Sequence, residues 1–342
     1  MRFLLIILAL FLGLIDTDAQ SRPEIFPEDI ESSTLNVKCL CQPGVDNKSR
    51  SRGLDISYQL LGNAIFEPKD QALQEPFSEQ ESLQGLIFKL RFPIINRERF
   101  RLIVGYSYRP ERYQIVNFGT DFTDIFQNLD QRWLKSNSFS LTLSKPLGEN
   151  YYTGLRLRLM SNGDYGQWLN FGERYTIYNA VGLFGIKKRS DLEWGVGINF
   201  SSSFRRTIAL PFVFYNQTFS EKWGVEMILP SQLYLRYNLK PTSIILTGFE
   251  YNSRSYSVDI NGTQGFNGIY NMNHSELRAI ASLEQRLVPW LWLNAKVGFQ
   301  LNFSTDFDAV DALNTSFNVE PTNSPFFQIG LFISPPNSYF NE

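Results

Sequence analysis

Charged side chains occupy alternate positions of runs whose remaining positions are apolar. In the run 192–200, for example, Glu193 lies between Leu192 and Trp194. Because side chains of a β-strand alternate between its two faces, the charges share one face and the apolar residues share the other. Unlike charges on neighbouring strands predict cross-strand ion pairs, whereas a surplus of cations predicts a passage that favours anions. The candidates are Lys89, Arg91, Arg101, Arg109, Arg156, Arg158, Glu193, Glu226, Arg236, Glu250, Arg278, Glu284 and Lys296, with Asp55 beside them.

Residues suited to nucleophilic catalysis are sparse. His274 is the single histidine and precedes Ser275, but neighbours on a strand point to opposite faces, so the two do not make a catalytic pair. We expect His274 to lie in a solvated loop, and its replacement by alanine to leave folding and activity intact. The sequence has no Gly-rich phosphate loop and no Gly-x-Ser-x-Gly motif, so it predicts no enzyme.

Metal-binding residues are also few. Cys39 and Cys41 are too close for an unstrained disulfide, and no histidine or second cysteine pair lies near them. The series Asp306-x-Asp308-x-x-Asp311 falls in a predicted loop and does not have EF-hand spacing. We therefore expect no metal and no cofactor.

The N-terminus has the pattern of an export signal. A basic Arg2 is followed by the apolar run 3–15 and by the small residue Ala19, which predicts a signal peptide over 1–19. The net charge is −2 over 342 residues, so the chain lacks the basic surface of a nucleic-acid-binding protein. Hydrophobic residues make up 43% and the mean hydropathy is −0.20, values that suit membrane strands better than membrane helices.

About fourteen alternating runs follow one another from residue 54 onward. Such runs behind an export signal predict an all-β fold, an antiparallel transmembrane β-barrel of 12–14 strands over 53–342. Residues 20–52 are mixed in character and predict a periplasmic N-terminal arm, or alternatively a plug. The faces of 175–186 are both mixed. Predicted lipid-facing residues include Leu157, Val196, Ile208, Leu210, Phe212, Phe214, Leu235 and Val297.

The connections between the runs alternate in length. Short ones are expected at 93–98, 145–150, 187–191, 216–222, 240–243 and 288–289. Long ones are expected at 63–82, 110–135, 161–174, 252–274 and 304–324. This alternation is typical of outer-membrane barrels, which have short periplasmic turns and longer extracellular loops. A soluble exported β-sandwich, the competing fold, gives no reason for it.

Several motifs resemble outer-membrane proteins. The run KVGFQLNF at 296–303 is similar to the assembly signal of outer-membrane barrels. The runs WGVE at 223–226, LRYN at 235–238, LEQR at 283–286 and WLWL at 290–293 resemble a family of uncharacterised outer-membrane β-barrels known as a domain of unknown function. The resemblance covers about 50–334 and implies a location and a fold, without a catalytic residue.

The sequence thus predicts a barrel in the outer membrane of a Gram-negative bacterium, acting as a small passive channel or as a structural or binding barrel. Its expected partners are outer-membrane lipid, the barrel-assembly machinery and a small solute, with no nucleic acid. The alternative function is an outer-membrane enzyme that acts on lipid or acyl chains.

Overall fold

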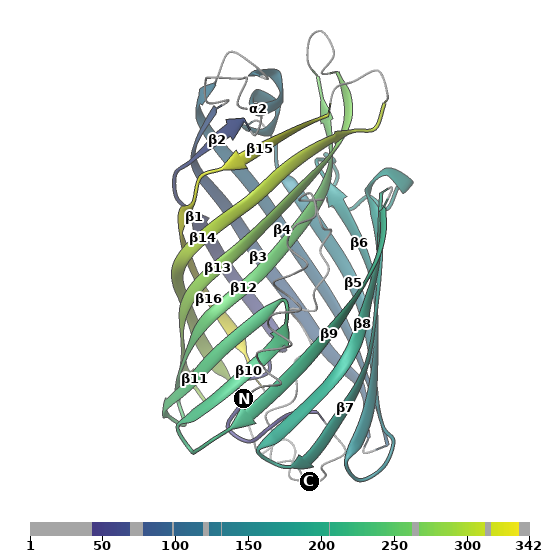
Figure 1. The fold of residues 1–342 in the computed structure, drawn as a ribbon, viewed down its shortest axis with the longest axis vertical. Coiled ribbons are helices and arrows are strands. Elements are labelled where there is room, and N and C mark those ends of the chain that lie inside the picture. Colours follow the sequence, from purple (N-terminus) through teal and green to yellow (C-terminus); the bar gives the residue numbers. More distant parts are fainter. Residues whose placement is uncertain are drawn as a thin grey trace, which may run out of the picture.

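The computed structural model describes residues 43–68, 78–97, 99–118, 123–130, 132–204, 206–261, 267–311 and 316–334. Within them, sixteen strands form one sheet, which closes because β1 pairs with both β3 and β16 (Figure 1). The strands are β1 Leu54–Leu61, β2 Ala64–Pro68, β3 Ser78–Arg97, β4 Phe100–Phe118, β5 Leu134–Pro146, β6 Tyr151–Gly163, β7 Thr176–Arg189, β8 Leu192–Ser203, β9 Arg206–Thr218, β10 Trp223–Leu229, β11 Gln232–Lys240, β12 Ser243–Ile260, β13 Gly268–Val288, β14 Leu291–Ala309, β15 Phe317–Pro321 and β16 Ser324–Ile333. The helices are α2 Thr123–Asp130 and the 3₁₀ turn η1 Glu173–Tyr175.

Although the sheet has sixteen strands, the barrel wall is fourteen strands around. Two of these fourteen positions each hold two short strands that lie end to end. β1 and β2 follow one another along one position, and β15 and β16 along the next. The break between β1 and β2 falls at Gly62, where a Cβ atom would lie 2.7 Å from Cγ of Pro325. The glycine therefore makes room for the proline ring. The structure confirms an antiparallel barrel with a strand number at the upper end of the predicted range.

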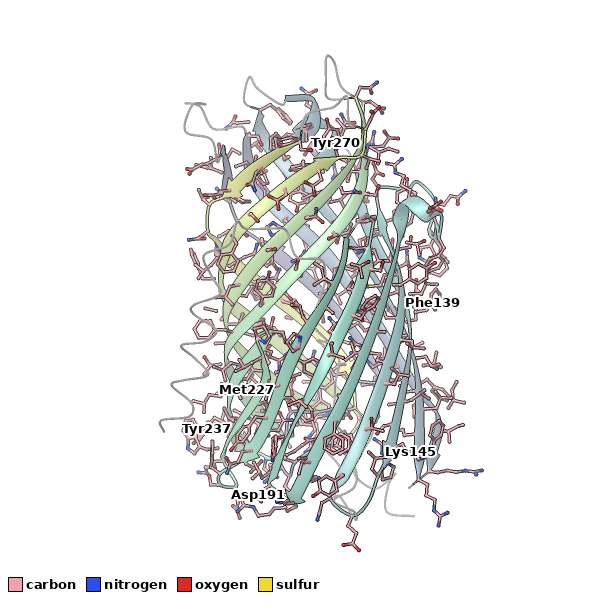
Figure 2. All side chains as sticks on the ribbon, turned by 45° about the vertical axis from the view of Figure 1, so that its right-hand side comes forward. Phe139, Lys145, Asp191, Met227, Tyr237 and Tyr270 are labelled. Carbon is pink, nitrogen blue, oxygen red and sulfur yellow. The ribbon has the colours of Figure 1, made fainter. Side chains whose placement is uncertain are left out.

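The alternation of faces also matches the sequence over most of the wall. Leu157, Val196, Leu235 and Val297 are 41–53% exposed on the outside, whereas neighbouring Glu193 and Arg236 are at most 1% exposed. Figure 2 shows side chains along the whole wall, with Lys145 and Asp191 at one end and Tyr270 at the other. We call the end with Lys145 and Asp191 the turn end, because the six short connections lie there. The opposite end, with Tyr270, is the loop end.

β9 is an exception, since its predicted orientation is wrong. Phe212 and Phe214 are buried and point inward, while Val213 between them is exposed. Their rings lie over Gly197 and Gly195 of β8, whose Cβ atoms would come within 2.3 and 2.4 Å of the ring atoms. Alternation could not reveal this, because both faces of β9 are apolar.

The strands extend well into the segments that the sequence predicted as long loops. β12 continues to Ile260 and β13 begins at Gly268, so most of the segment 252–274 is strand. The polar residues that suggested a loop lie on these extensions. In contrast, β10 and β11 have only seven and nine residues.

At the loop end the barrel narrows and is filled. Ser257 of β12 forms a parallel bridge with Gly163 of β6, although five strands, β7–β11, separate β12 from β6 further down the wall. α2 lies at this end (Figure 1) and buries Ile125, Phe126 and Leu129 in an apolar core with residues of β2, β4, β12, β13 and β14. Burial of the apolar face explains why this short helix forms in its context. No helix among the described residues has the length and the apolar character needed to cross a membrane.

Candidate functional site: a charged lumen

Residues 43–53, which we call the strap, precede β1 and contact inward-facing groups of several strands in succession. The backbone nitrogen of Gly44 donates to Oε2 of Glu193 at 3.0 Å. The hydroxyl of Thr218 and the side-chain amide of Asn238 donate to carbonyl oxygens of the strap, at 2.5 and 3.1 Å. At the other end, the nitrogen of Gly53 donates to the carbonyl oxygen of Ile333 at 2.8 Å.

Buried carboxylates hold the middle of the strap. Both the backbone nitrogen and the hydroxyl of Ser49 donate to Glu226, at 2.9 and 2.6 Å. Arg52 binds Glu284 of β13 at 2.6 Å and Asp55 of β1 at 2.7 Å. Its guanidinium also lies 4.4 Å from the ring centroid of Phe332. Because Glu226 and Glu284 are almost fully buried, loss of these partners would remove part of the compensation for the desolvation of each carboxylate, although Arg236 would still lie 3.0 Å from Glu226.

One cavity, of about 170 Å³, lies beside the strap and is lined mainly by β1, β3 and β10–β14. We call it the strap cavity. Its charged lining residues include ion pairs such as Lys296 with Glu250, 2.6 Å apart. Both signs of charge are present: the lining residues are Lys48, Arg50, Arg52, Lys89, Arg91, Arg109, Arg254, Arg278 and Lys296, and Asp55, Glu226, Glu250 and Glu284.

A second cavity, of about 220 Å³, is lined by β3–β7 and the strap. We call it the cationic cavity, because its described lining residues include six cations and no aspartate or glutamate. The cations are Arg52, Lys89, Arg91, Arg101, Arg156 and Arg158. Hydroxyl groups from β4 and β5 accompany them, from Ser107, Ser138, Ser140, Thr142 and Ser144.

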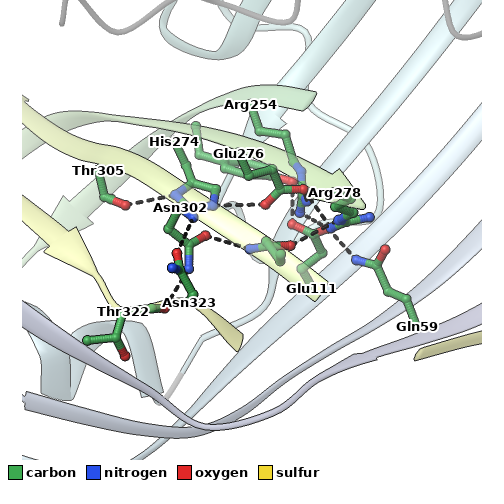
Figure 3. A network of polar contacts seen from close by, with 12 residues as sticks. Gln59, Glu111, Arg254, His274, Glu276, Arg278, Asn302, Thr305, Thr322 and Asn323 are labelled. Carbon is green, nitrogen blue, oxygen red and sulfur yellow. Dashed lines mark hydrogen bonds and ion pairs between the residues drawn. The ribbon is translucent and has the colours of Figure 1, made fainter. Parts of the chain in front are cut away.

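Between the strap cavity and the apolar core of the loop end lies a buried network of ion pairs (Figure 3). Arg254 binds both Glu111 of β4 and Glu276 of β13, each at 2.5 Å, so it links opposite parts of the wall. Arg278 lies 2.6 Å from the same Glu276 oxygen, and its guanidinium stacks 4.2 Å from the ring of Phe326. These buried charges neutralise one another in ion pairs, an arrangement that favours a rigid layer.

His274 belongs to this network, so the prediction of a solvated loop histidine is wrong. It lies within β13 and is 7% exposed. Its Nδ1 is 2.7 Å from Oγ1 of Thr305, and its Nε2 is 2.9 Å from Oε2 of Glu276. The residue was misplaced because the polar run around it was read as a loop, although it faces polar partners across a strand pair.

The thirteen charges predicted as lumen-lining fall into three places. The strap cavity is lined by Glu226, Glu250, Arg278, Glu284, Lys296 and Arg109. Both cavities are lined by Lys89 and Arg91. Arg101, Arg156 and Arg158 line the cationic cavity. Glu193 contacts Gly44, and Arg236 lies 3.0 Å from Glu226.

Sequence reasoning missed Glu111 and Arg254, which lay in the predicted loops 110–135 and 252–274, and Glu276, which lies just beyond the second of them. The even-numbered series Glu250, Asn252 and Arg254 continues the inward face of β12, and this signal could have found the arginine.

Metal ligands do not gather in the described part of the chain, where no group of three or more His, Cys, Asp or Glu residues is placed to hold an ion. Asp306 and Asp308 lie on β14 rather than in a loop, and each accepts a hydrogen bond from an asparagine of a neighbouring strand. Cys39 and Cys41 lie outside the described residues, as do the predicted signal peptide and residues 20–42.

Solved outer-membrane proteins are similar to this chain. A FadL homologue from Pseudomonas aeruginosa is 8% identical, with 82% of this chain and 89% of that chain covered and a TM-score of 0.42. An outer membrane channel from Pseudomonas putida F1 is 13% identical, with 85% and 99% covered and a TM-score of 0.41. The P. putida toluene transporter TodX is 7% identical, with 82% and 89% covered and a TM-score of 0.38. No curated protein matches the chain.

A family model defines the affiliation of the sequence. The model described as "Domain of unknown function (DUF6268)" matches residues 123–334, from the start of α2 to the residue after β16. The match covers more than half of the chain and most of the barrel wall, and it confirms the resemblance predicted from the sequence motifs. The chain therefore belongs to the DUF6268 family.

Proposed function

We propose that the protein is a passive channel of the outer membrane, with the turn end in the periplasm and the loop end outside the cell. The outward apolar face of the fourteen wall positions supports a location in lipid. The observation that carries the channel is the pair of charged cavities inside the wall, on both sides of the strap. A purely structural barrel needs no open space inside its wall, because its interior can be filled by side chains.

Two internal closures keep the conductance of this channel small. The strap makes hydrogen bonds to strands from β8 to β16, and the core around α2 fills the loop end. We include the strap in the proposal as a plug that is held by hydrogen bonds rather than by covalent bonds. A plug of this type is released when its carboxylate anchors lose their donors.

The test compares two substitutions of Ser49, whose hydroxyl donates to Glu226. Ser49→Asp places a second carboxylate against Glu226, and the repulsion of like charges weakens the strap. Ser49→Asn introduces a side chain of nearly the same volume as aspartate, and its amide group can still donate a hydrogen bond to Glu226. In planar lipid bilayers we expect small stepwise conductance from the wild type and from Ser49→Asn, and larger or more frequent openings from Ser49→Asp.

Silence of all three proteins, each shown to be folded by circular dichroism, would contradict the channel and favour a structural or binding barrel. Equal conductance of the two variants would contradict the strap as a plug while leaving the channel in place.

The competing enzyme class gains one geometric argument from the structure. Thr305, His274 and Glu276 form a hydroxyl–imidazole–carboxylate series like that of a hydrolase. However, Thr305 is fully buried, and neither of the two cavities is lined by it or by His274. A nucleophile needs access to its substrate, so our proposal treats this series as part of the packed ion-pair layer.

A further inference from the structure

A row of hydroxyl groups runs along the inward face of β5. Four successive inward positions hold Ser138, Ser140, Thr142 and Ser144, and all four line the cationic cavity. Because alternate residues of a strand share a face, these side chains follow one another at intervals of about 7 Å. Ser107 of β4 lies opposite Ser138 and lines the same cavity. We call these five residues the hydroxyl stripe.

The hydroxyl groups of the stripe are not used by the fold. Among the hydrogen bonds of the described residues, none involves a side chain of the stripe, although Ser138 is only 4% exposed. By comparison, Ser282 accepts a hydrogen bond from Asn294 at 2.9 Å, and Ser255 donates one to Asn273 at 2.7 Å. A buried hydroxyl costs free energy unless it is hydrogen-bonded, so the stripe requires partners that enter the cavity.

The cations of this cavity, in contrast, are compensated within the protein. Arg52 is ion-paired with Glu284 and Asp55. Partners are also present for four further cations of the lining, Lys89, Arg91, Arg101 and Arg156. The groups that await a partner are therefore hydroxyls, which both donate and accept hydrogen bonds. A neutral solute that carries hydroxyl groups of its own matches them.

Neighbouring members of the stripe are close enough to contact one small ligand. Ser107 and Ser138 face each other across the β4–β5 pair, where opposite Cβ atoms lie about 5 Å apart. Ser140 lies opposite Gly105, and a Cβ atom on this glycine would come within 2.5 Å of Oγ of Ser140. The glycine thus leaves the space that the Ser140 hydroxyl occupies. Adjacent hydroxyl groups of a polyol can reproduce the hydrogen bonds that water makes to such a row.

The position and volume of the cavity restrict the ligand further. Asn96 and Ser144, which lie close to the ends of β3 and β5, belong to its lining, so the cavity extends to the turn end. Its volume of about 220 Å³ is below the range of cavities that hold drug-sized ligands. The size thus admits a small polyol rather than an oligosaccharide.

We propose that the hydroxyl stripe binds small neutral polyols, such as glycerol and erythritol, and that they are the solutes of the channel. The first part concerns binding alone. The second part rests on the proposed channel, whose solute class it names. The two parts are measured separately, so that failure of one is distinguishable from failure of the other.

Binding is tested with erythritol, a neutral four-carbon polyol, which is titrated into the purified full-length barrel in detergent and followed by the NMR line width of the ligand. We expect saturable binding by the wild type, and at least about tenfold weaker binding by the triple variant Ser138→Ala, Ser140→Ala, Thr142→Val. Ser202→Ala with Thr207→Val is the control, because it removes two hydroxyls that lie 3.2 Å apart and exposed on β8 and β9.

Three single variants extend this test. Ser140→Ala gives a smaller loss if the triple variant does not fold. Gly105→Ala displaces the Ser140 hydroxyl without removing it, and should also weaken binding. Arg158→Gln, at a half-buried position opposite Ser140, removes one charge of the lining and should change the affinity by no more than about twofold, because the ligand is neutral.

Absence of saturable erythritol binding by folded wild-type protein would overturn the site, as would equal affinity of the wild type and the triple variant. Loss of binding in Arg158→Gln with full binding in Ser140→Ala would overturn recognition by the hydroxyls. Inorganic phosphate completes the series, and tighter binding of phosphate than of erythritol would overturn the assignment of a neutral ligand.

Transport is tested by the swelling of proteoliposomes in isosmotic erythritol. We expect faster swelling than in protein-free vesicles for the wild type and for the control variant, and slower swelling for the triple variant. Equal rates for the wild type and the triple variant would overturn the assignment of the solute but not the channel. A wild type that binds erythritol but swells no faster than protein-free vesicles would overturn the channel but not the site.

Discussion

Single residues in the lumen act through the partners that they compensate. Glu276 accepts contacts from Arg254, Arg278 and His274, and its side chain is fully buried. The three donors come from positions on β12 and β13 that sequence reasoning placed partly in a loop. Local composition misled because a polar run on a strand looks like a loop until its partners on the neighbouring strands are known.

Replacement of Glu276 by alanine is expected to lower the free energy of unfolding by about 3–5 kcal/mol, because it removes the carboxylate that Arg278 binds and one of the two carboxylates that Arg254 binds in a buried layer. Denaturant titration in detergent, followed by tryptophan fluorescence, measures the loss. Glu149→Ala at the exposed β5–β6 turn is the matched control and should change stability little. A loss of similar size in both variants would contradict the role assigned to Glu276.

Replacement of His274 by alanine is expected to lower the free energy of unfolding by about 1–3 kcal/mol, since two side-chain hydrogen bonds are lost. This outcome replaces the neutral effect that the sequence suggested. His274→Gln retains part of the bonding and should lose less. Wild-type stability of His274→Ala in the same titration would show that the network does not depend on the imidazole.

Whole strands are oriented by their contacts with the next strand, and β9 shows the limit of alternation as a guide. Most strands carry polar groups on one face, so the sequence predicts their orientation correctly. β9 has apolar residues on both faces, and only the glycines of β8 decide that Phe212 and Phe214 point inward. The pairing partner, rather than the strand itself, holds this information.

Phe212→Ala is expected to destabilise the barrel by about 3–5 kcal/mol, because the ring fills the space above Gly197. Val213→Ala, one residue further on, removes a side chain that faces outward and should cost less, since lipid can occupy the vacated space. Unfolding titrations of the two variants provide the comparison. A larger cost for Val213→Ala would restore the orientation that the sequence alone predicts.

The barrel as a whole was predictable in its class, its strand number and most of its faces, because these follow from a period of two repeated along the chain. Its narrowed loop end was not predictable. The bridge between Ser257 and Gly163 joins residues 94 positions apart, with five other strands between them in sequence. Likewise, nothing in the sequence of α2 itself predicts that its apolar face packs in the core of the loop end.

Val196→Arg is expected to cost about 2–4 kcal/mol if the wall faces lipid, because an exposed outward residue would then carry a charge in the hydrocarbon region. Val196→Leu is the control and should be nearly neutral. Folding into lipid vesicles with subsequent denaturant titration measures both. If Val196→Arg were as stable as the wild type, the outer face of the wall around Val196 would not lie in a membrane. Gly197 is unsuitable as the inward counterpart, because Phe212 covers it.

The pairing of β1 with β16 sets an order of events during folding. The ring of strands cannot close before the last strand has been synthesised and delivered, and its closing pairs include Leu54 with Ile333. The backbone nitrogen of Gly53 donates to the carbonyl oxygen of the same Ile333, so the strap lies directly beside the β1–β16 pair that closes the barrel. A strap that enters before closure is enclosed by the ring, and can then leave only through an open end. Its capture is therefore a matter of timing as well as of affinity.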